Sequence, residues 1–424
     1  MESVGAIYTG WIRRTLIEPK HTFSFIGFEW LQPLPGNGMY IWYGIMGLAG
    51  IFVMIGFKYR WSMLSFALLW SGTYLMQKSS YNNHYYLLML LSFIMVAQPA
   101  NAYLSVDARL NPKIRQISMP RWCAMVFILQ MFIVYTYGAM AKIYPDWLDG
   151  TVAEVLMRGK KDLYLIGDLL QQKWTHYTIA YFGIVFDALI IPLLLWRPTR
   201  KFAFIASIFF HLFNSFVFQI GIFPYLSLAF ILFFFPTKTI HQIFLKRKPF
   251  YDKNELIVPK YHKPFLAAFI IYFIFQIGLP LRHWLIKDDV LWTEEGHRLA
   301  WRMMLRAKSG RTTYKVVDAK TNREIPIHLE DFLSNKQIRT ASSKPDVMWQ
   351  FSQRLKKSFA AKGIDVKVFV DAQIRVNGGE LHQLTDPTVD LGSVPWRPFK
   401  HSDWLLPSPL QNQPKTSETE DYFD

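Results

Sequence analysis

Long apolar runs fill most of the chain before residue 285 and restrict it to folds that a lipid bilayer can hold. A helix needs about 20 apolar residues to cross a bilayer. Eight candidate helices can be read, at residues 39–57, 61–76, 85–97, 122–141, 177–196, 202–218, 220–236 and 265–281. Only 18% of the 424 residues are charged and the mean hydropathy is +0.12, whereas a soluble protein carries about a quarter charged residues. We therefore predict a polytopic α-helical membrane protein with about eight spans.

The basic residues between these runs predict which side of the membrane each loop faces. The loops after the first, third, fifth and seventh runs hold 16 Lys and Arg residues, whereas the alternate loops hold one lysine, balanced charge or no charge. Loops on the cytoplasmic side carry the excess of Lys and Arg, so these four loops are predicted to be cytoplasmic. The formal net charge of +16 is then a topology signal, and we expect no nucleic acid partner.

The same topology leaves residues 1–38 on the extracytoplasmic side, although they contain Arg13, Arg14 and Lys20. No earlier apolar run is present in the sequence to carry them across. The first helix is therefore either a reversed anchor, or a native N-terminal helix is missing from this chain, and we favour the second explanation.

The pattern changes after residue 285, where a small extracytoplasmic domain of α+β or β-rich type is expected. Alternating apolar residues from Val366 to Ile374 indicate a half-buried strand. Residues 314–317 and 324–328 read as a strand pair around a turn. Residues 347–359 follow helical spacing behind a start signal at Ser343 and Asp346.

The predicted domain organisation has four parts. They are an N-terminal extracytoplasmic segment, a transmembrane helical catalytic domain, the extracytoplasmic soluble domain and a flexible tail, at residues 1–38, 39–285, 286–410 and 411–424.

Four places put polar side chains where a membrane-embedded chain normally has none. They are the hairpin between the second and third runs, the end of the fourth run, the middle of the fifth, and one face of the sixth. Ionisable groups inside spans are functional candidates by default. The candidate residues are Asn82, Asn83, His84, Lys142, Asp187, His211, Asn214 and Ser215.

Each candidate also has a structural interpretation. Lys142 could extend its amine to the membrane interface from a helix end, and His84 with its two asparagines could cap the third helix. A hydrogen bond between Asp187 and His211 is predicted as a contact between neighbouring helices. A functional role is favoured because Lys142, the hairpin and the outer half of the sixth helix are expected on one side of the membrane at similar depth.

These residues suggest a chemistry. A buried lysine with few carboxylates nearby in sequence would be a neutral amine that accepts a proton near pH 7. An aromatic, apolar cavity open to the bilayer suits a lipid-soluble substrate such as a quinol. The sequence contains no HExxH, GxxxxGK[ST] or GxGxxG motif, so we expect no metal or nucleotide cofactor.

From about Gly27 to Pro407 the chain resembles the vitamin K-dependent γ-glutamyl carboxylase family. The resemblance is carried in order by LQPLPGNGMYIWY, SSYNNHYYL, NAYLSVDARLN, FIVYTYGAMAKIYPDWLDG, FFHLFNSFVFQIGIFPY, LAWRMMLRAKSG, LTDPTVDL and VPWRPF. So many ordered matches are more specific than any single motif. The soluble part matters, because membrane domains of this type also occur without it in proteins of unknown activity.

The resemblance implies a coupled reaction. A lysine deprotonates vitamin K hydroquinone, or a menaquinol, which then reacts with O2 to form a strong base. This base removes a γ-proton from a glutamate in a protein or peptide substrate, the carbanion captures CO2, and the quinol leaves as its epoxide. Through the resemblance Lys142 is the lysine base, His84 serves carboxylation, and Asn83 contacts the quinol. Asn82, His211, Asn214 and Asp187 are assigned to substrate binding in the same cavity.

The chain departs from the animal enzymes in several places. They have a lysine pair where this chain has Ala141 and Lys142, and a tryptophan where it has Tyr81. They also have an additional first helix, a long luminal extension and a luminal disulfide, whereas the one cysteine here, Cys123, lies in an apolar run. We expect a bacterial-type member in the inner membrane, with its active site and C-terminal domain on the extracytoplasmic side. Two alternatives stay open: a quinol epoxidase that has lost carboxylation, and a non-catalytic lipid- or quinone-binding membrane protein.

Overall fold

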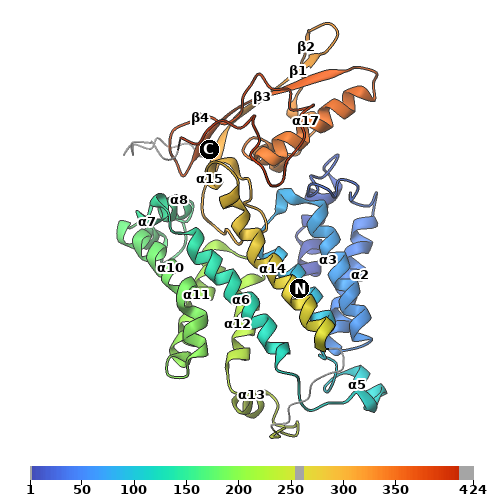
Figure 1. Ribbon diagram of the computed structural model, residues 1–424, viewed down its shortest axis with the longest axis vertical. Coiled ribbons are helices and arrows are strands. Elements are labelled where there is room, and N and C mark those ends of the chain that lie inside the picture. The colour runs from blue at the N-terminus through green and yellow to red at the C-terminus, as the bar shows by residue number, and fades with distance from the viewer. Residues whose placement is uncertain (1, 254–261, 410–424) are drawn as a thin grey trace. The chain divides into compact units, whose positions relative to one another are not determined.

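The computed structural model describes residues 2–253 and 262–409, and within these ranges the chain forms two compact units. The first unit comprises Met1–Glu18, Ser24–Ala139 and Val185–Ile277, and the second comprises Pro19–Phe23, Met140–Ile184 and Gly278–Asp424, each as far as it is described. Figure 1 labels the helices and strands of both. The predicted tail at 411–424 lies outside the described residues.

Every apolar run of the sequence forms a helix. The longer helices are α2 (Gly38–Ile55), α3 (Tyr59–Met76), α4 (Asn83–Ala97), α6 (Trp122–Ala141), α10 (Lys173–Leu195), α11 (Arg200–Phe218), α12 (Phe223–Ile231) and α14 (His262–Leu281). Short helices stand between or beside them: α1 (Glu2–Tyr8), α5 (Val106–Leu110), α7 (Pro145–Leu148), α8 (Thr151–Arg158), α9 (Gly167–Leu170) and α13 (Thr237–Phe244).

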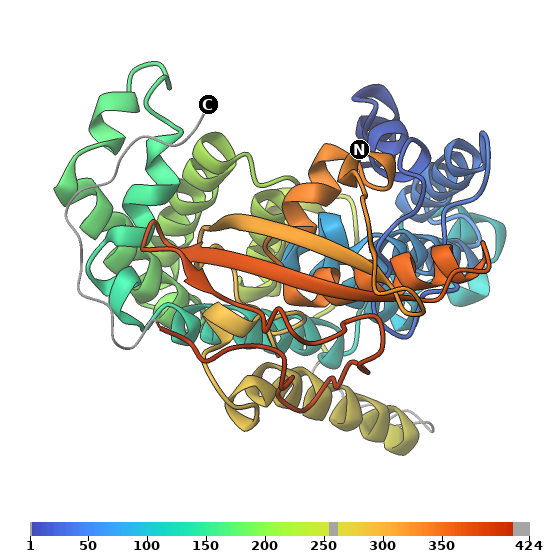
Figure 2. The same ribbon diagram turned by 90° about the horizontal axis from the view of Figure 1, so that it is seen from above.

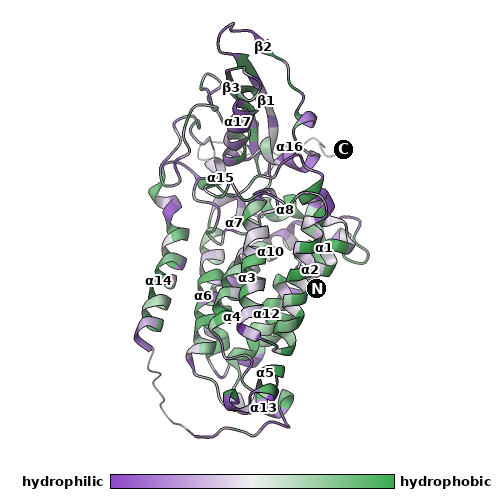
Figure 3. Cartoon of the chain, turned by 90° about the vertical axis from the view of Figure 1, so that its right-hand side faces the viewer, coloured by the Kyte–Doolittle hydropathy of each residue, from purple (hydrophilic) through white to green (hydrophobic). Residues whose placement is uncertain are grey.

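Fewer of these helices can cross a bilayer on their own than the eight runs suggest. Among the described residues, five are long and apolar enough, namely α2, α6, α10, α11 and α14 with its continuation to Leu285. A sixth span results if Phe223–Phe234 and α13, which meet at a bend of 119°, count as one. Figure 3 shows hydrophobic residues along these helices. The polytopic helical fold is confirmed; α4 falls short because it has 15 residues.

Helix α2 packs closely against α3, the helix that leads into the polar hairpin. The indole N–H of Trp42 on α2 donates to the carbonyl of Leu69 at 3.1 Å and to Thr73 Oγ1 at 3.0 Å. A Cβ atom at Gly72 would lie 2.6 Å from the Trp42 ring, so only glycine permits this approach.

A buried polar chain joins α4, α6 and α14 within the first unit. Tyr272 donates to Gln130 Oε1 at 2.6 Å, Gln130 donates to Gln276 at 3.4 Å, and Gln276 donates to Tyr86 at 3.1 Å. Polar groups in an apolar interior are costly unless paired, so this chain of bonds fixes how the three helices face one another.

The second unit contains a four-stranded antiparallel sheet in the order β2-β1-β3-β4. Two long strands form its centre, β1 (Lys308–Asp318) and β3 (Val366–Val376), and Figure 2 shows them side by side. The edge strands β2 (Glu324–Ile325) and β4 (His382–Gln383) have two residues each. The alternation in 366–374 therefore predicted β3 correctly, whereas β1 is longer and β2 shorter than predicted.

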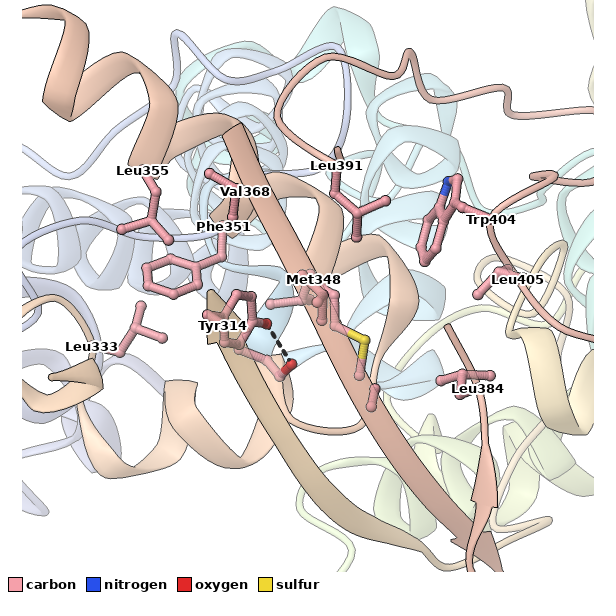
Figure 4. Packing of buried hydrophobic residues seen from close by; sticks show 14 of the residues in the cluster. Tyr314, Leu333, Met348, Phe351, Leu355, Val368, Leu384, Leu391, Trp404 and Leu405 are labelled. Carbon is pink, nitrogen blue, oxygen red and sulfur yellow. Dashed lines mark hydrogen bonds between the residues drawn. The ribbon is translucent and has the colours of Figure 1, made fainter. Parts of the chain in front are cut away.

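Helix α17 (Pro345–Ala360) covers one face of this sheet and supplies much of its core. Phe351 and Leu355 on α17 pack with Val368 on β3 and Tyr314 on β1 (Figure 4). The Tyr314 hydroxyl donates to the carbonyl of Ala341, at the end of α16 (Asn335–Ala341), at 2.8 Å. The helical spacing of 347–359 predicted α17, but Lys344 is the N-cap and makes no side-chain cap bond.

Candidate functional site

The polar hairpin of the sequence is a break between α3 and α4 that is held by its own side chains. A 3₁₀ turn, Lys78–Ser80, follows α3, and the buried Gln77 donates to the carbonyl of Thr15 at 2.9 Å. Asn82 Oδ1 accepts from the Tyr85 N–H at 2.7 Å, so Asn82 is the N-cap of α4. The predicted cap is therefore present, although it is made by Asn82 and not by His84.

Asn83 and His84 point to different partners. Asn83 is buried, and its Oδ1 accepts from the Tyr81 hydroxyl at 2.8 Å. The His84 ring is half-buried and stacks on Phe223, the first residue of α12, with 4.5 Å between ring centroids. The Tyr81 hydroxyl thus orients the Asn83 amide.

Phe223 brings His84 and His211 to the same place. The His211 ring on α11 meets Phe223 edge-on at 5.8 Å, and His211 is only 1% exposed. The two histidines predicted as site residues thus contact one phenylalanine from different helices. Asn214 lies one turn further along α11 and is half-buried.

The predicted hydrogen bond between Asp187 and His211 is wrong. His211 Nε2 lies 2.9 Å from the hydroxyl of Tyr135 on α6, and His211 Nδ1 has no hydrogen-bond partner among the described residues. Asp187 is buried on α10, and it is the neighbouring Phe186 whose ring contacts His211. The Tyr135 hydroxyl on α6, and not the Asp187 carboxylate, is therefore the hydrogen-bond partner of the His211 ring.

A cavity of about 280 Å³ is lined in part by the hairpin, within the first unit. Its walls are aromatic and hydroxylated side chains with Gln77 and Ser80 of the hairpin, and the remaining lining residues are Gly5, Ala6, Thr9, Trp11, Tyr43, Trp70, Thr73, Tyr74 and Tyr85. Ligand pockets for drug-sized molecules are about 300–1,000 Å³, so this cavity is of a size for a ring system. None of the predicted site residues is among the residues that line it.

Lys142 belongs to the second unit and is buried there. It follows the last residue of α6 and is 8% exposed, so the snorkelling interpretation does not hold. Its Nζ lies 5.6 Å from the centroid of the Trp147 ring. The Trp147 indole N–H in turn donates to the Ala180 carbonyl at 3.0 Å, which fixes the ring under the amine.

Two contacts tie the Lys142 segment to the residues that enter β1. The Tyr144 hydroxyl donates to the Leu305 carbonyl, and Ala141 packs with Leu305 in one apolar cluster. Asn377, just after β3, donates to Asp146 at 2.9 Å and accepts from the Ala307 N–H at 3.0 Å. The segment that holds the lysine and the segment 305–307 are therefore positioned together.

Arg306 of this segment belongs to a cluster of charges, which we call the cation cluster: Glu294, His297, Arg306, Lys308 and Lys344. Glu294 is at its centre, and its carboxylate accepts from Arg306 Nε at 2.8 Å and from Lys344 Nζ at 2.9 Å. Arg306 also binds the second carboxylate oxygen. Lys308 Nζ lies 3.7 Å from Glu294 and donates to the Trp292 carbonyl, with its side chain only 1% exposed.

The cation cluster has more positive than negative charge. One carboxylate faces an arginine and two lysines, and burying excess charge is costly unless an anion balances it. Burial opposes ionisation of Glu294, but Arg306 and the two lysines outweigh this and hold its pKa well below the usual range. Burial lowers the pKa of Lys308 to about 7 and that of Lys344 to about 8, although Glu294 partly counters both shifts.

His297 supplies an unused donor to the same cluster. Its Nε2 lies 3.1 Å from Arg306 Nη1, and because arginine only donates, Nε2 accepts and the proton is on Nδ1. Burial and Arg306 hold the pKa of His297 well below its usual value, so the ring is neutral. His297 Nδ1 is buried and has no hydrogen-bond partner among the described residues. An incoming carboxylate would both accept from it and balance the cations.

The backbone around the cation cluster is strained. Glu294, Leu299, Trp301 and Met304 have φ values of 62°, 59°, 55° and 51°, in the left-handed region that residues other than glycine seldom adopt. Such strain concentrates at functional sites, where tertiary contacts hold it.

Sequence patterns did not reveal the cation cluster or the burial of Lys78. Lys78 is 2% exposed in the hairpin, and the sequence pattern gave no indication of this burial. The signal for the cluster was present in part: LAWRMMLRAKSG places Arg306 and Lys308 among apolar residues. In the described ranges, no group of three or more His, Cys, Asp and Glu residues is arranged to hold a metal ion.

Comparison with known families covers most of the chain. A family model described as HTTM domain matches residues 1–238, which is more than half of the sequence, and a second, described as vitamin K-dependent gamma-carboxylase, lumenal domain, matches residues 261–411. No solved structure matches the chain. The apolar helices and the first match indicate a membrane protein, and the second label indicates that the C-terminal domain lies on the non-cytoplasmic side.

The two matches confirm the family resemblance of the motifs. Their order along the chain, membrane domain first and lumenal domain second, is the order in which the sequence changes from apolar helices to an α+β domain. The chain therefore belongs to the HTTM-domain family and, through its second matched region, to the γ-carboxylase family.

Proposed function

We propose that the protein is an integral membrane γ-glutamyl carboxylase. It would couple O2-dependent epoxidation of a vitamin K-type hydroquinone, or a menaquinol, to addition of CO2 at the γ-carbon of a peptide glutamate. The overall reaction balances as quinol, O2, CO2 and glutamate giving quinone epoxide, γ-carboxyglutamate and water. The two matched domains support this class of enzyme, and the site residues supply groups for each half of the reaction.

Lys142 is the base for the quinol in this proposal. The Lys142 amine is buried, and its Nζ lies over the Trp147 ring. Asn83, oriented by Tyr81, would hold a quinol oxygen. Asn82, His211, Asn214 and Asp187 are assigned to the surroundings of the substrate, with Asn82 fixing the hairpin and Tyr135 fixing the His211 ring.

The observation that carries the proposal is the connection between the segment that follows Lys142 and the segment that contains Arg306. Tyr144 and Asp146, just after the lysine, are bonded to the segment that contains Arg306. A glutamate side chain that brings its carboxylate to Arg306, Lys308 and His297 Nδ1 would then have its γ-carbon near the lysine segment. A base for the quinol and a receptor for the carboxylate belong to one unit of the protein.

Incorporation of labelled CO2 tests the proposal. The full-length protein in lipid nanodiscs receives reduced quinone, O2 and a Glu-containing peptide, and both peptide label and quinone epoxide are measured. We expect Lys142→Ala to abolish both products and His84→Ala to reduce carboxylation more than epoxidation. Lys161→Ala, an exposed lysine of the second unit, serves as the matched control and should leave both unchanged. No label in the peptide with well-folded wild-type protein would refute the carboxylase.

The same assay separates the alternatives. Epoxide that forms at the same rate with and without glutamate peptide would identify a quinol epoxidase that has lost carboxylation. Absence of both products, with quinone still bound and Lys142→Ala without effect on that binding, would identify a non-catalytic quinone- or lipid-binding protein. Location in a bacterial inner membrane is part of the same proposal, with the C-terminal domain outside the cytoplasm.

A further inference from the structure

Strand β1 has a long open edge. β1 lies between β2 and β3, but β2 pairs only with Val316 and Val317. The stretch from Ser309 to Lys315 therefore has β3 on one side and, in the part of the chain that the structure describes, no strand on the other. Unpaired strand edges are templates for pairing with another chain, and proteins usually cover them.

The pairing pattern tells which backbone groups face outward. On β3, Val368 and Ala372 bond away from β1, to Asp390, Leu391 and Leu384. In an antiparallel ladder the alternate, odd-numbered residues of β3 then bond β1, and they lie opposite odd-numbered residues of β1. The outward N–H and C=O groups are therefore those of Gly310, Thr312 and Tyr314.

These outward groups are available to a partner. Neither Gly310, Thr312 nor Tyr314 has a backbone hydrogen bond across this edge to any described residue. Gly310 and its neighbours Ser309, Arg311 and Thr313 are exposed, Thr312 is half-buried, and Tyr314 is buried. The edge offers alternating donors and acceptors at the two-residue spacing that an added strand requires.

The face of the sheet beside this edge is basic. Odd-numbered residues of β1 and β3 point away from α17, because their even-numbered neighbours Tyr314 and Val368 are in the α17 core. The charged side chains on that face are four cations and one anion, Arg311, Lys315, Lys367, Arg375 and Asp371. Lys315 is also 3.7 Å from Glu324, an exposed pair of small energetic value.

We propose that the β1 edge from Ser309 to Lys315 docks an extended, acidic segment of the protein substrate as an added strand. The proposal rests on the proposed function, because substrates rich in glutamate supply the acidic side chains. The same cations discourage a second copy of this basic edge from pairing. β1 begins at Lys308, a member of the cation cluster, so a segment docked along the edge leads directly to the place where a glutamate would react.

The first test uses backbone chemistry. A fluorescent decapeptide of alternating Glu and Val is titrated with the full-length protein, and binding is read by fluorescence anisotropy without quinol or CO2. Two further versions carry N-methyl groups on all Glu or on all Val residues. Only one alternate set of a strand faces its neighbour, so we expect one version to bind at least tenfold more weakly and the other within about twofold of the parent. Equal affinity of both versions would overturn the proposal.

The second test uses the protein. Thr312→Pro removes an outward N–H but no bond to β3, and proline is tolerated on strand edges. Arg311→Glu reverses a charge on the basic face, and Arg323→Glu makes the same change at the exposed turn beyond the edge. We expect at least tenfold weaker binding for the first two variants and unchanged binding for the third. Equal affinity of all three would sink the edge model.

The outcome can be told apart from failure of the enzyme proposal. Peptide binding with the expected pattern, in a protein that incorporates no CO2, would support the docking edge and refute the carboxylase. If CO2 is fully incorporated into the peptide and all three variants bind the peptide with the affinity of the wild type, the carboxylase proposal would stand and the docking proposal would be refuted. A decapeptide of alternating Lys and Val should not bind, and its binding would remove the role given to charge.

Discussion

In the proposed site, the charges of individual residues in the cation cluster would govern how well an acidic ligand binds. The Lys308 side chain is buried and the Lys344 side chain is half-buried next to one carboxylate, and desolvation lowers the pKa of Lys308 to about 7 and that of Lys344 to about 8. Each pKa is lowered, so each lysine is positive below that value and loses its charge as the pH rises through it. Attraction for a substrate carboxylate therefore decreases with rising pH.

This gives a prediction for the pH dependence of peptide binding. The KM for a glutamate peptide should increase by about tenfold or more between pH 6.5 and pH 9. The reason is that above the pKa of a lysine its charged fraction falls about tenfold per pH unit. Lys344→Arg keeps its charge throughout, because arginine stays protonated, and should leave only the smaller rise that follows Lys308. A KM that is flat over this range would contradict anion binding by the two lysines.

The orientation of Asn83 depends on one hydroxyl. Tyr81→Phe removes the bond from the Tyr81 hydroxyl to Asn83 Oδ1 and leaves the ring. A single hydrogen bond contributes about 0.5–1.5 kcal/mol, so we expect the KM for quinol to rise by roughly two- to tenfold, with the KM for peptide unchanged. Tyr137→Phe removes a comparable bond to the Ile277 carbonyl and is the control. Equal effects of the two variants would show that Tyr81 has no special part in quinol binding.

At the scale of elements, the periodic apolar patterns predicted β3 and α17 correctly, whereas the predicted start signal of α17 was wrong. The strand from 366 and the helix from 347 formed as predicted, because alternate or i, i+3, i+4 apolar positions must share one face. The expected start signal of α17 failed, because Asp346 binds Arg298 at 2.9 Å and does not cap the helix. A distant partner overrode a local rule.

The packing of α17 on the sheet yields a stability prediction. Phe351 is fully buried against Tyr314 and Leu355. Phe351→Ala should lower the free energy of unfolding of the sheet by about 3–5 kcal/mol, because the cavity cannot close fully. Lys357→Ala, on the exposed face of the same helix, should change it by less than about 0.5 kcal/mol. Hydrogen exchange of β3 amides in the full-length protein measures both, and similar protection in the two variants would argue against α17 as the main support of the sheet.

At the scale of the whole molecule, the distribution of charge predicts how the chain is inserted. The basic loops are expected in the cytoplasm and the lumenal-type domain outside it. The sequence has one cysteine, Cys123, which is 1% exposed. It should therefore not react with thiol reagents, so introduced cysteines can be labelled selectively.

Cysteine labelling in intact cells checks this topology. Thr321→Cys, in the turn between β1 and β2, should react with a membrane-impermeant maleimide, whereas Lys113→Cys, in a basic loop, should react only after the cells are broken. Wild-type protein should stay unlabelled in both conditions. The reverse pattern for the two positions would place the C-terminal domain in the cytoplasm.

The sequence by itself determined the helices, the central strands and the candidate residues of the hairpin. These depend on runs and periods of apolar residues and on polar groups that stand out within them, and both are local properties of the chain. Family motifs added roles for Lys142 and His84, which stay proposals until activity is measured.

Only the tertiary structure decided which distant side chains meet. It joined His84 and His211 through Phe223 and gave His211 the Tyr135 hydroxyl in place of Asp187. It also gathered Glu294, Arg306 and Lys344 into one buried cluster from positions up to 50 residues apart. Such contacts depend on how helices and loops pack, and a local pattern of charge or hydropathy does not show which residues distant in sequence will meet.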